Sequence, residues 1–146
     1  QLGTEGHYTV TPEMKAKMAD FCGGFATEAE DAAAIRELYD ETGYVIDTHT
    51  GVASAVYQQY KKNTGDETKT VIASTASPYK FSRSVMEAIS DEKLPEDEFA
   101  VIDELCRVSG VEIPKAVEEI RNAQIRHKLE CDVQDMKKTV AKILGI

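Results

Sequence analysis

Apolar residues recur at every third or fourth position through most of the chain, a spacing that places them on one face of an α-helix. Capping residues and first-turn prolines precede most of these runs, and several runs end at a glycine. We therefore predict about six helices, with their apolar faces directed into a core. The candidate starts lie at Thr11-Pro12, the T-x-x-E box of Thr27 and Glu30, Asp47 to Thr50, Pro78, Pro95, Pro114 and Asp132. The inward faces of the first and last runs are Met14, Met18, Phe21, Val133, Met136, Val140, Ile143 and Leu144.

One segment departs from this helical pattern. Thr70–Ser74 is an unbroken, β-branched run, which is typical of a strand covered on both faces. Tyr44–Ile46 could be a second strand or an extended buried connection, and "HKLEC" at 127–131 could be one more strand. We predict an α/β fold that is predominantly helical, with about six helices around one to three strands. Because a lone strand has unpaired edges, we expect an incomplete part of a larger sheet, which missing sequence or another copy would complete.

Length and composition narrow the classes of protein. With 146 residues, 42% of them apolar, the chain is expected to form a single unit over residues 1–146. Its formal net charge of −9 argues against nucleic acid as a partner, because phosphate contacts need clustered Lys and Arg. No window approaches 18 uninterrupted apolar residues, and the N-terminus does not resemble a signal peptide, so we predict no membrane span and a cytoplasmic protein. The start without Met indicates a processed or excised piece.

The three cysteines lie far apart in the sequence. Cys22, Cys106 and Cys131 form no C-x-x-C pair, so we predict no metal site and no disulfide framework. Reduced cysteines that mostly fill the core fit this pattern best.

The segment Asp47-Thr48-His49-Thr50 places a histidine beside a carboxylate at the start of a helix. An imidazole in this position could bind an anion or move a proton. Alternatively, Asp47 or Thr48 caps the helix and His49 only makes a local hydrogen bond. Composition alone leaves both interpretations open.

Three hydroxyls, Ser74, Thr75 and Ser77, gather where the predicted strand ends and the next helix begins. No G-x-S-x-G pattern surrounds them, and no histidine or lysine lies at nucleophile spacing, so nucleophilic catalysis is not expected. A hydroxyl at the carboxyl end of a strand could bind a ring nitrogen or carbonyl of a ligand, or it could cap the helix. Lys80 could bind a phosphate or lie on the surface, and "FCGGF" lacks the flanking elements of a phosphate loop.

Two stretches of the sequence match a known pattern. "GYVIDTHTGVASAVYQQY" and "STASPYKF" resemble the C-terminal third of threonine synthases of the bacterial and fungal type, which show G-Y-x-x-D-P-H-T-A-V and then T-A-x-P-x-K-F. The resemblance is dense from about Tyr8 to Ile89 and thin afterwards. We therefore expect residues 1–90 to match the family closely and residues 91–146 to form a helical C-terminal extension. The matching residues are Gly43, Tyr44, Asp47, His49, Thr50, Val52, Thr75, Ala76, Pro78, Lys80 and Phe81.

The resemblance implies a pyridoxal 5'-phosphate (PLP) enzyme of fold type II, a lyase that converts O-phospho-L-homoserine and water into L-threonine and phosphate. By this resemblance Thr75 is the partner of the pyridine nitrogen, and its neutral hydroxyl leaves that nitrogen unprotonated. Asp47, His49, Ser77 and Lys80 are then candidates for supporting or substrate-facing roles. Three positions depart from the pattern: Thr48 replaces a proline, Gly51 an alanine, and Ser77 a common histidine.

The family's Schiff-base lysine, in an S-F-K-D segment, and its Asn/Gly-rich phosphate loop have no counterpart in this sequence. We therefore expect a fragment that is inactive alone, contains no catalytic residue, does not bind PLP, and self-associates through unpaired sheet edges. Its small-molecule substrate would bind only to the full-length enzyme. Two alternatives stay open: a non-catalytic helical interaction or regulatory module, and part of another fold-type-II PLP lyase.

Overall fold

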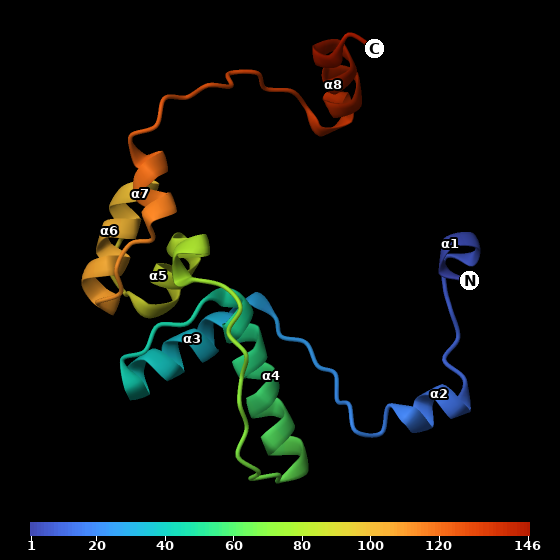
Figure 1. The fold of residues 1–146 in the computed structure, drawn as a ribbon. Coiled ribbons are helices and arrows are strands. Elements are labelled where there is room, and N and C mark those ends of the chain that lie inside the picture. Colours follow the sequence, from blue (N-terminus) through green and yellow to red (C-terminus); the bar gives the residue numbers. More distant parts are fainter. The chain divides into compact units, whose positions relative to one another are not determined.

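A computed structural model describes residues 1–146, and all of its regular structure is helical (Figure 1). Two short 3₁₀ turns, η1 (Pro78–Phe81) and η2 (Val133–Asp135), accompany the α-helices. The eight α-helices are α1 (Leu2–Glu5), α2 (Pro12–Lys17), α3 (Glu28–Thr42), α4 (Thr48–Thr64), α5 (Ser82–Ile89), α6 (Glu98–Ser109), α7 (Lys115–Arg121) and α8 (Met136–Leu144).

Several of the predicted signals for helix ends are confirmed. Thr27 and Glu30 form a complete capping box at the start of α3, and Gly43 ends that helix with a φ of 70°. Asp47 caps α4 through its side chain. The start predicted at Pro95 is wrong, because Asp97 caps α6, which begins at Glu98. Asp132 precedes η2 but makes no side-chain cap hydrogen bond. Because the Thr27–Glu30 box and the Asp47 cap lie within one turn of the chain, the spacing of residues was enough to predict them.

The core lies among α3, α4, α5 and α6. Helix α3 packs against α4 and α5, and α5 packs against α6 and η1 (Figure 1). Burial of this apolar surface is the main stabilising contribution that the structure shows. The buried apolar residues are Ala34, Ile35, Val45, Ile46, Ala55, Tyr79, Val85, Met86, Ala88, Ile89, Val101, Ile102 and Leu105.

The prediction of an α/β fold is wrong, because the chain forms no strand. Thr70–Ser74 is an irregular connection in which Val71 is 91% exposed, and residues 127–131 are exposed and irregular as well. A strand needs a second extended segment to receive its main-chain hydrogen bonds, and none pairs with Thr70–Ser74. Tyr44–Ile46 is an extended connection, the alternative to a strand, in which Val45 and Ile46 are buried and Tyr44 is exposed. Self-association of the chain stays a prediction.

The chain divides into two compact units, Gln1–Glu112 and Ile113–Ile146. Helices α1, α2, α7 and α8 contain no buried residue. The prediction that the apolar faces of the first and last runs point inward is therefore wrong. Helices form at both places, but α2 ends at Lys17, before Met18 and Phe21. None of the helices combines the length and apolar character needed to cross a membrane.

The prediction of mostly buried cysteines is also wrong. Cys22 and Cys131 are exposed, and Cys106 is half-buried. All three are free thiols.

Candidate functional site

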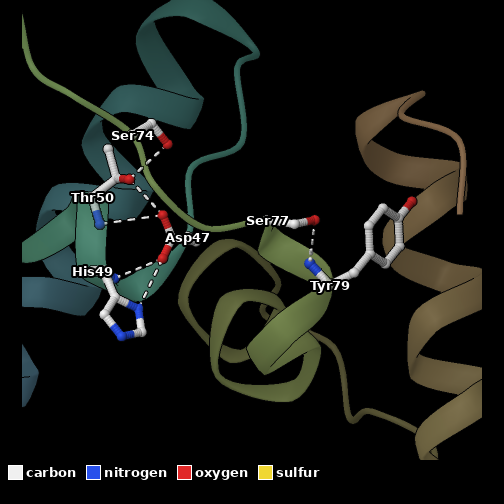
Figure 2. Close-up of polar contacts among 6 residues, drawn as sticks. All are labelled: Asp47, His49, Thr50, Ser74, Ser77 and Tyr79. Atoms are coloured by element: carbon white, nitrogen blue, oxygen red, sulfur yellow. Dashed lines mark hydrogen bonds and ion pairs between the residues drawn. The ribbon is translucent and has the colours of Figure 1, made fainter. Parts of the chain in front are cut away.

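The first turn of α4 is built around the carboxylate of Asp47, whose side chain is 0% exposed. This carboxylate accepts hydrogen bonds from the backbone N–H groups of His49, at 2.9 Å, and Thr50, at 3.3 Å. It also accepts from the Thr50 hydroxyl and from His49 Nδ1, the latter at 3.0 Å (Figure 2). A buried charge is stable only when it is well hydrogen-bonded, and Asp47 meets that condition.

Opposing effects set the protonation of Asp47. Burial raises the pKa of this carboxyl, but the hydrogen bonds from the Thr50 hydroxyl, the two backbone N–H groups and the His49 ring lower it more. The net pKa lies below its usual value, so Asp47 is an ionised acceptor at neutral pH.

The ionised state of Asp47 fixes the direction of the next hydrogen bond. Thr50 has one hydroxyl proton, and it donates that proton to Asp47. Ser74 Oγ lies 2.8 Å from Thr50 Oγ1, so Ser74 must be the donor in this pair (Figure 2). A hydrogen-bonded chain therefore runs from the connection after α4, through Thr50, to the carboxylate that caps α4.

His49 lies at the surface end of the same group. Its Nδ1 donates to the Asp47 carboxylate, which leaves Nε2 as an acceptor in the neutral ring. The His49 side chain is 51% exposed, and its ring stacks on Phe81 with centroids 5.6 Å apart. The Nζ of Lys80 lies 5.5 Å from the centre of the same Phe81 ring. An imidazole oriented by a carboxylate in this way can accept a proton at Nε2 or bind a donor group of a ligand.

A second carboxylate, Asp31 on α3, approaches the start of α4 closely. A Cβ at Gly51 would collide with Asp31 Oδ1 and would lie 2.8 Å from Ile35 Cγ1, so the absence of a side chain at Gly51 permits this contact. Asp31 Oδ1 is buried without a hydrogen-bond partner. Burial, followed by repulsion from Asp47, raises the pKa of Asp31, and His49 opposes the rise.

A cleft of about 470 Å³ borders this region. Its lining combines an apolar floor with carboxylates and hydroxyls from α3, α4 and α5. The lining residues are Glu28, Asp31, Ala32, Ile35, Thr48, Phe81, Ser84, Glu87 and Ala88. No group of three or more His, Cys, Asp and Glu side chains is arranged to bind a metal ion.

We call the hydrogen-bonded residues Asp47, His49, Thr50 and Ser74 the Asp47 group. The other candidates from the sequence lie outside it. Thr75 is exposed and its hydroxyl makes no hydrogen bond. Ser77 caps η1 by accepting from the Tyr79 N–H at 3.3 Å (Figure 2). Lys80 is exposed and shares only the Phe81 ring with His49. The structure therefore brings Asp47 and His49 together, but it does not join Thr75, Ser77 or Lys80 to them by hydrogen bonds.

Sequence reasoning missed three contributors to this region: Thr50 as a link, Asp31, and Phe81 as a stacking surface. The D-x-x-T spacing from Asp47 to Thr50 is a signal for the first, because it places a hydroxyl at the third helical position next to the cap. No spacing connects Asp31 or Phe81 with the segment from Asp47 to Gly51, because their contacts depend on how α3 and η1 lie against the start of α4.

Comparison with known proteins gives one family. The family described as "Threonine synthase, C-terminal" matches residues 50–140, which is more than half of the chain. This match begins just after Asp47 and His49 and continues past residue 90. No solved structure matches the chain.

Three individual relatives support the same family. The chain is 35% identical over 88 residues to threonine synthase of Schizosaccharomyces pombe and 30% identical over 92 residues to that of Corynebacterium glutamicum. It is also 30% identical over 97 residues to human threonine synthase-like 1. These alignments cover 59%, 62% and 66% of the chain but only 17%, 18% and 13% of the relatives. The matched region is therefore a small part of each of them.

Proposed function

Because the chain belongs to the threonine synthase C-terminal family, we propose that it is the C-terminal portion of a threonine synthase. That enzyme converts O-phospho-L-homoserine and water into L-threonine and phosphate. The observation that carries the proposal is the family match over residues 50–140. The geometry supports it, since the Asp47 group joins the start of α4 to the segment that contains Thr75.

The cofactor in this proposal is PLP, which supplies an electron sink for the substrate's carbon atoms when it is bound. Thr75 fits a contact with the pyridine nitrogen, because its exposed hydroxyl has no partner within the chain and can donate. Thr75 would therefore orient the ring. The sequence offers no candidate for the Schiff-base lysine or the phosphate loop, so we propose that the chain alone neither binds PLP nor turns over substrate.

His49 and Asp47 have a supporting role in this proposal. The Asp47 carboxylate fixes His49 with Nδ1 as donor, so that Nε2 faces outward beside Phe81. In this orientation His49 can exchange a proton with a bound substrate or with water. Lys80, exposed next to the same ring, supplies a positive charge that suits the phosphate group of the substrate.

A hybrid enzyme tests the proposal. The matched region of the S. pombe threonine synthase is replaced by this chain, and the release of phosphate from O-phospho-L-homoserine is measured. We expect an active hybrid that loses about tenfold in turnover or PLP affinity in Thr75→Val, because one hydrogen bond to the cofactor is lost. Thr70→Val is the matched control, since Thr70 is also exposed and bonds only to the carbonyl of Thr68.

The outcomes separate clearly. A hybrid that folds and binds PLP but releases no phosphate would contradict the proposed activity. Equal effects of Thr75→Val and Thr70→Val would remove the assigned role of Thr75.

One observation favours a second candidate, a non-catalytic interaction module. Helix α8 and its flanks expose a set of large apolar side chains, which often marks a surface that binds another protein. These residues are Val133, Met136, Val140, Ile143, Leu144 and Ile146. An inactive hybrid, together with a partner that binds the chain and is lost in Val140→Lys, would favour this candidate over the first.

A further inference from the structure

We propose that Thr50 and Ser74 are positioning residues that fix the place of Thr75 relative to the helical core. This inference rests on the proposed function, in which Thr75 contacts the pyridine nitrogen of PLP. It assigns to these two hydroxyls a role that acts through Thr75.

The segment that carries Thr75 has very few attachments. Asp66 at its start is bound by Tyr60, and Ser77 at its end caps η1. Between Thr68 and Ser77, the only hydrogen bond to a helix is the one from Ser74 to Thr50, at 2.8 Å. Most side chains of the segment are exposed, Thr75 among them, so apolar packing contributes little to its order. The position of Thr75 therefore depends on this bond together with the cap that Ser77 forms two residues later.

Thr50, the partner of Ser74 in this bond, is itself firmly held. Thr50 is buried in the first turn of α4, and its hydroxyl donates to the ionised, fully buried Asp47. A hydrogen bond to a charged acceptor is stronger than one between neutral groups. Because that bond uses the only hydroxyl proton of Thr50, its oxygen is left to accept from Ser74. Both the place and the direction of the Ser74 bond are thus determined by the cap of α4.

The short distance along the chain lets the bond between Ser74 and Thr50 restrict the position of Thr75. With the bond formed, Thr75 lies one residue after a fixed point and two residues before Ser77. Without it, the chain from Thr68 to Ser77 becomes a flexible loop with many more conformations. A flexible hydroxyl would have to lose this freedom when it contacts the cofactor, which weakens binding.

The test is made first on the full chain without cofactor. Backbone amide relaxation of Thr75 and Ala76 is measured in Ser74→Ala, in Ser74→Thr and in the unchanged chain. We expect the order parameter of both amides to fall below about 0.6 in Ser74→Ala and to stay near 0.85 in Ser74→Thr, which keeps the hydroxyl. The urea midpoint of unfolding should not change, because Ser74 is exposed.

A matched control and a second readout complete the test. Ser84→Ala removes another exposed serine hydroxyl, from α5, and should leave the order of Thr75 unchanged. In the hybrid enzyme, Ser74→Ala should weaken the affinity for PLP about fivefold, and Ser74→Thr should restore it.

Unchanged order at Thr75 in Ser74→Ala would overturn the inference, whatever the hybrid does. Failure of the proposed function gives a different pattern. In that case Ser74→Ala loosens Thr75 in the free chain, but neither Ser74→Ala nor Thr75→Val affects PLP binding in the hybrid.

Discussion

Two polar segments of the unit Gln1–Glu112 carry the candidate residues, and the helical core holds them in different ways. The segment from Asp47 to Thr50 starts α4, and its central carboxylate is fully buried with four hydrogen bonds. The segment from Ser74 to Ser77 leads into η1, is mostly exposed, and reaches the core through a single hydroxyl pair.

This difference distinguishes residues that position other residues from residues that can contact a ligand. A residue that must meet a ligand needs a free polar atom, and Thr75 has one because nothing in the chain uses its hydroxyl. A residue that positions other residues needs hydrogen bonds to its own polar atoms, as the Asp47 carboxylate has. Substitution of a ligand-contacting residue such as Thr75 should have little effect on stability, whereas substitution of a positioning residue such as Asp47 should destabilise the fold.

The largest expected effect is that of Asp47→Ala. This change removes the cap of α4 and leaves the buried Thr50 hydroxyl without its charged acceptor. We expect the free energy of unfolding to fall by about 3 kcal/mol, measured by urea denaturation followed by circular dichroism.

Asp97→Ala is the matched control for Asp47→Ala. Asp97 also caps a helix, α6, but it is exposed and accepts only one hydrogen bond, from Ala100 N–H at 2.8 Å. Its loss should cost about 1 kcal/mol. Equal losses at the two positions would mean that burial and the Thr50 bond add nothing to the cap.

Two valines, one from each of the β-prone segments Tyr44–Ile46 and Thr70–Ser74, give the next largest contrast. Val45 is 5% exposed and Val71 is 91% exposed. Val45→Ala should lower the free energy of unfolding by about 2 kcal/mol through a cavity in the core. Val71→Ala should change it by less than about 0.5 kcal/mol, because no packing is lost.

A large loss of stability in Val71→Ala would show that residue 71 packs against another surface in solution. Sedimentation of both variants over a range of concentrations would identify that surface as a second copy if association weakens only in Val71→Ala. This measurement also tests the predicted self-association of the chain.

Helix starts were predictable from the sequence because capping is local. The Thr27–Glu30 box and the cap at Asp47 each join residues within three positions of one another. The irregular path of Thr70–Ser74, where a strand was expected, was not predictable in the same way. A β-branched run indicates only that the chain is extended, whereas a strand also requires a partner that the run itself does not specify.

The candidate site was predictable to a similar extent. The pairing of Asp47 with His49 follows from their proximity in the sequence. The bond from Thr50 to Ser74 joins residues 24 positions apart and depends on the path of the connection after α4. The approach of Asp31 to Gly51 likewise depends on how α3 packs against α4.

Gly51→Ala tests that approach. An alanine Cβ would collide with Asp31 Oδ1 and lie 2.8 Å from Ile35 Cγ1, so α3 and α4 would have to move apart. We expect a net loss of about 1 kcal/mol in the free energy of unfolding, because the higher helix propensity of alanine offsets part of the overpacking. Adding Asp31→Ala should recover part of the loss. Additive effects of the two changes would mean that the Asp31 contact does not determine the need for glycine.

The smallest expected effect distinguishes the two carboxylates by pH. Asp31 has a raised pKa, so the folded chain binds more protons than the unfolded chain in the window just above the ordinary Asp pKa. Its ionisation therefore lowers stability as the pH rises through that window, and Asp31→Asn should stabilise the chain at pH 7 but not at pH 3.

Asp47 has a lowered pKa, so its contribution is present above the ordinary Asp pKa and is lost as the pH falls through its folded value. Asp47→Asn should therefore destabilise the chain at pH 7, with a difference that shrinks in acid. Urea unfolding of both variants from pH 3 to pH 7 measures the two slopes, and slopes of the same sign would contradict the assignment of Asp31 as an unsatisfied carboxylate.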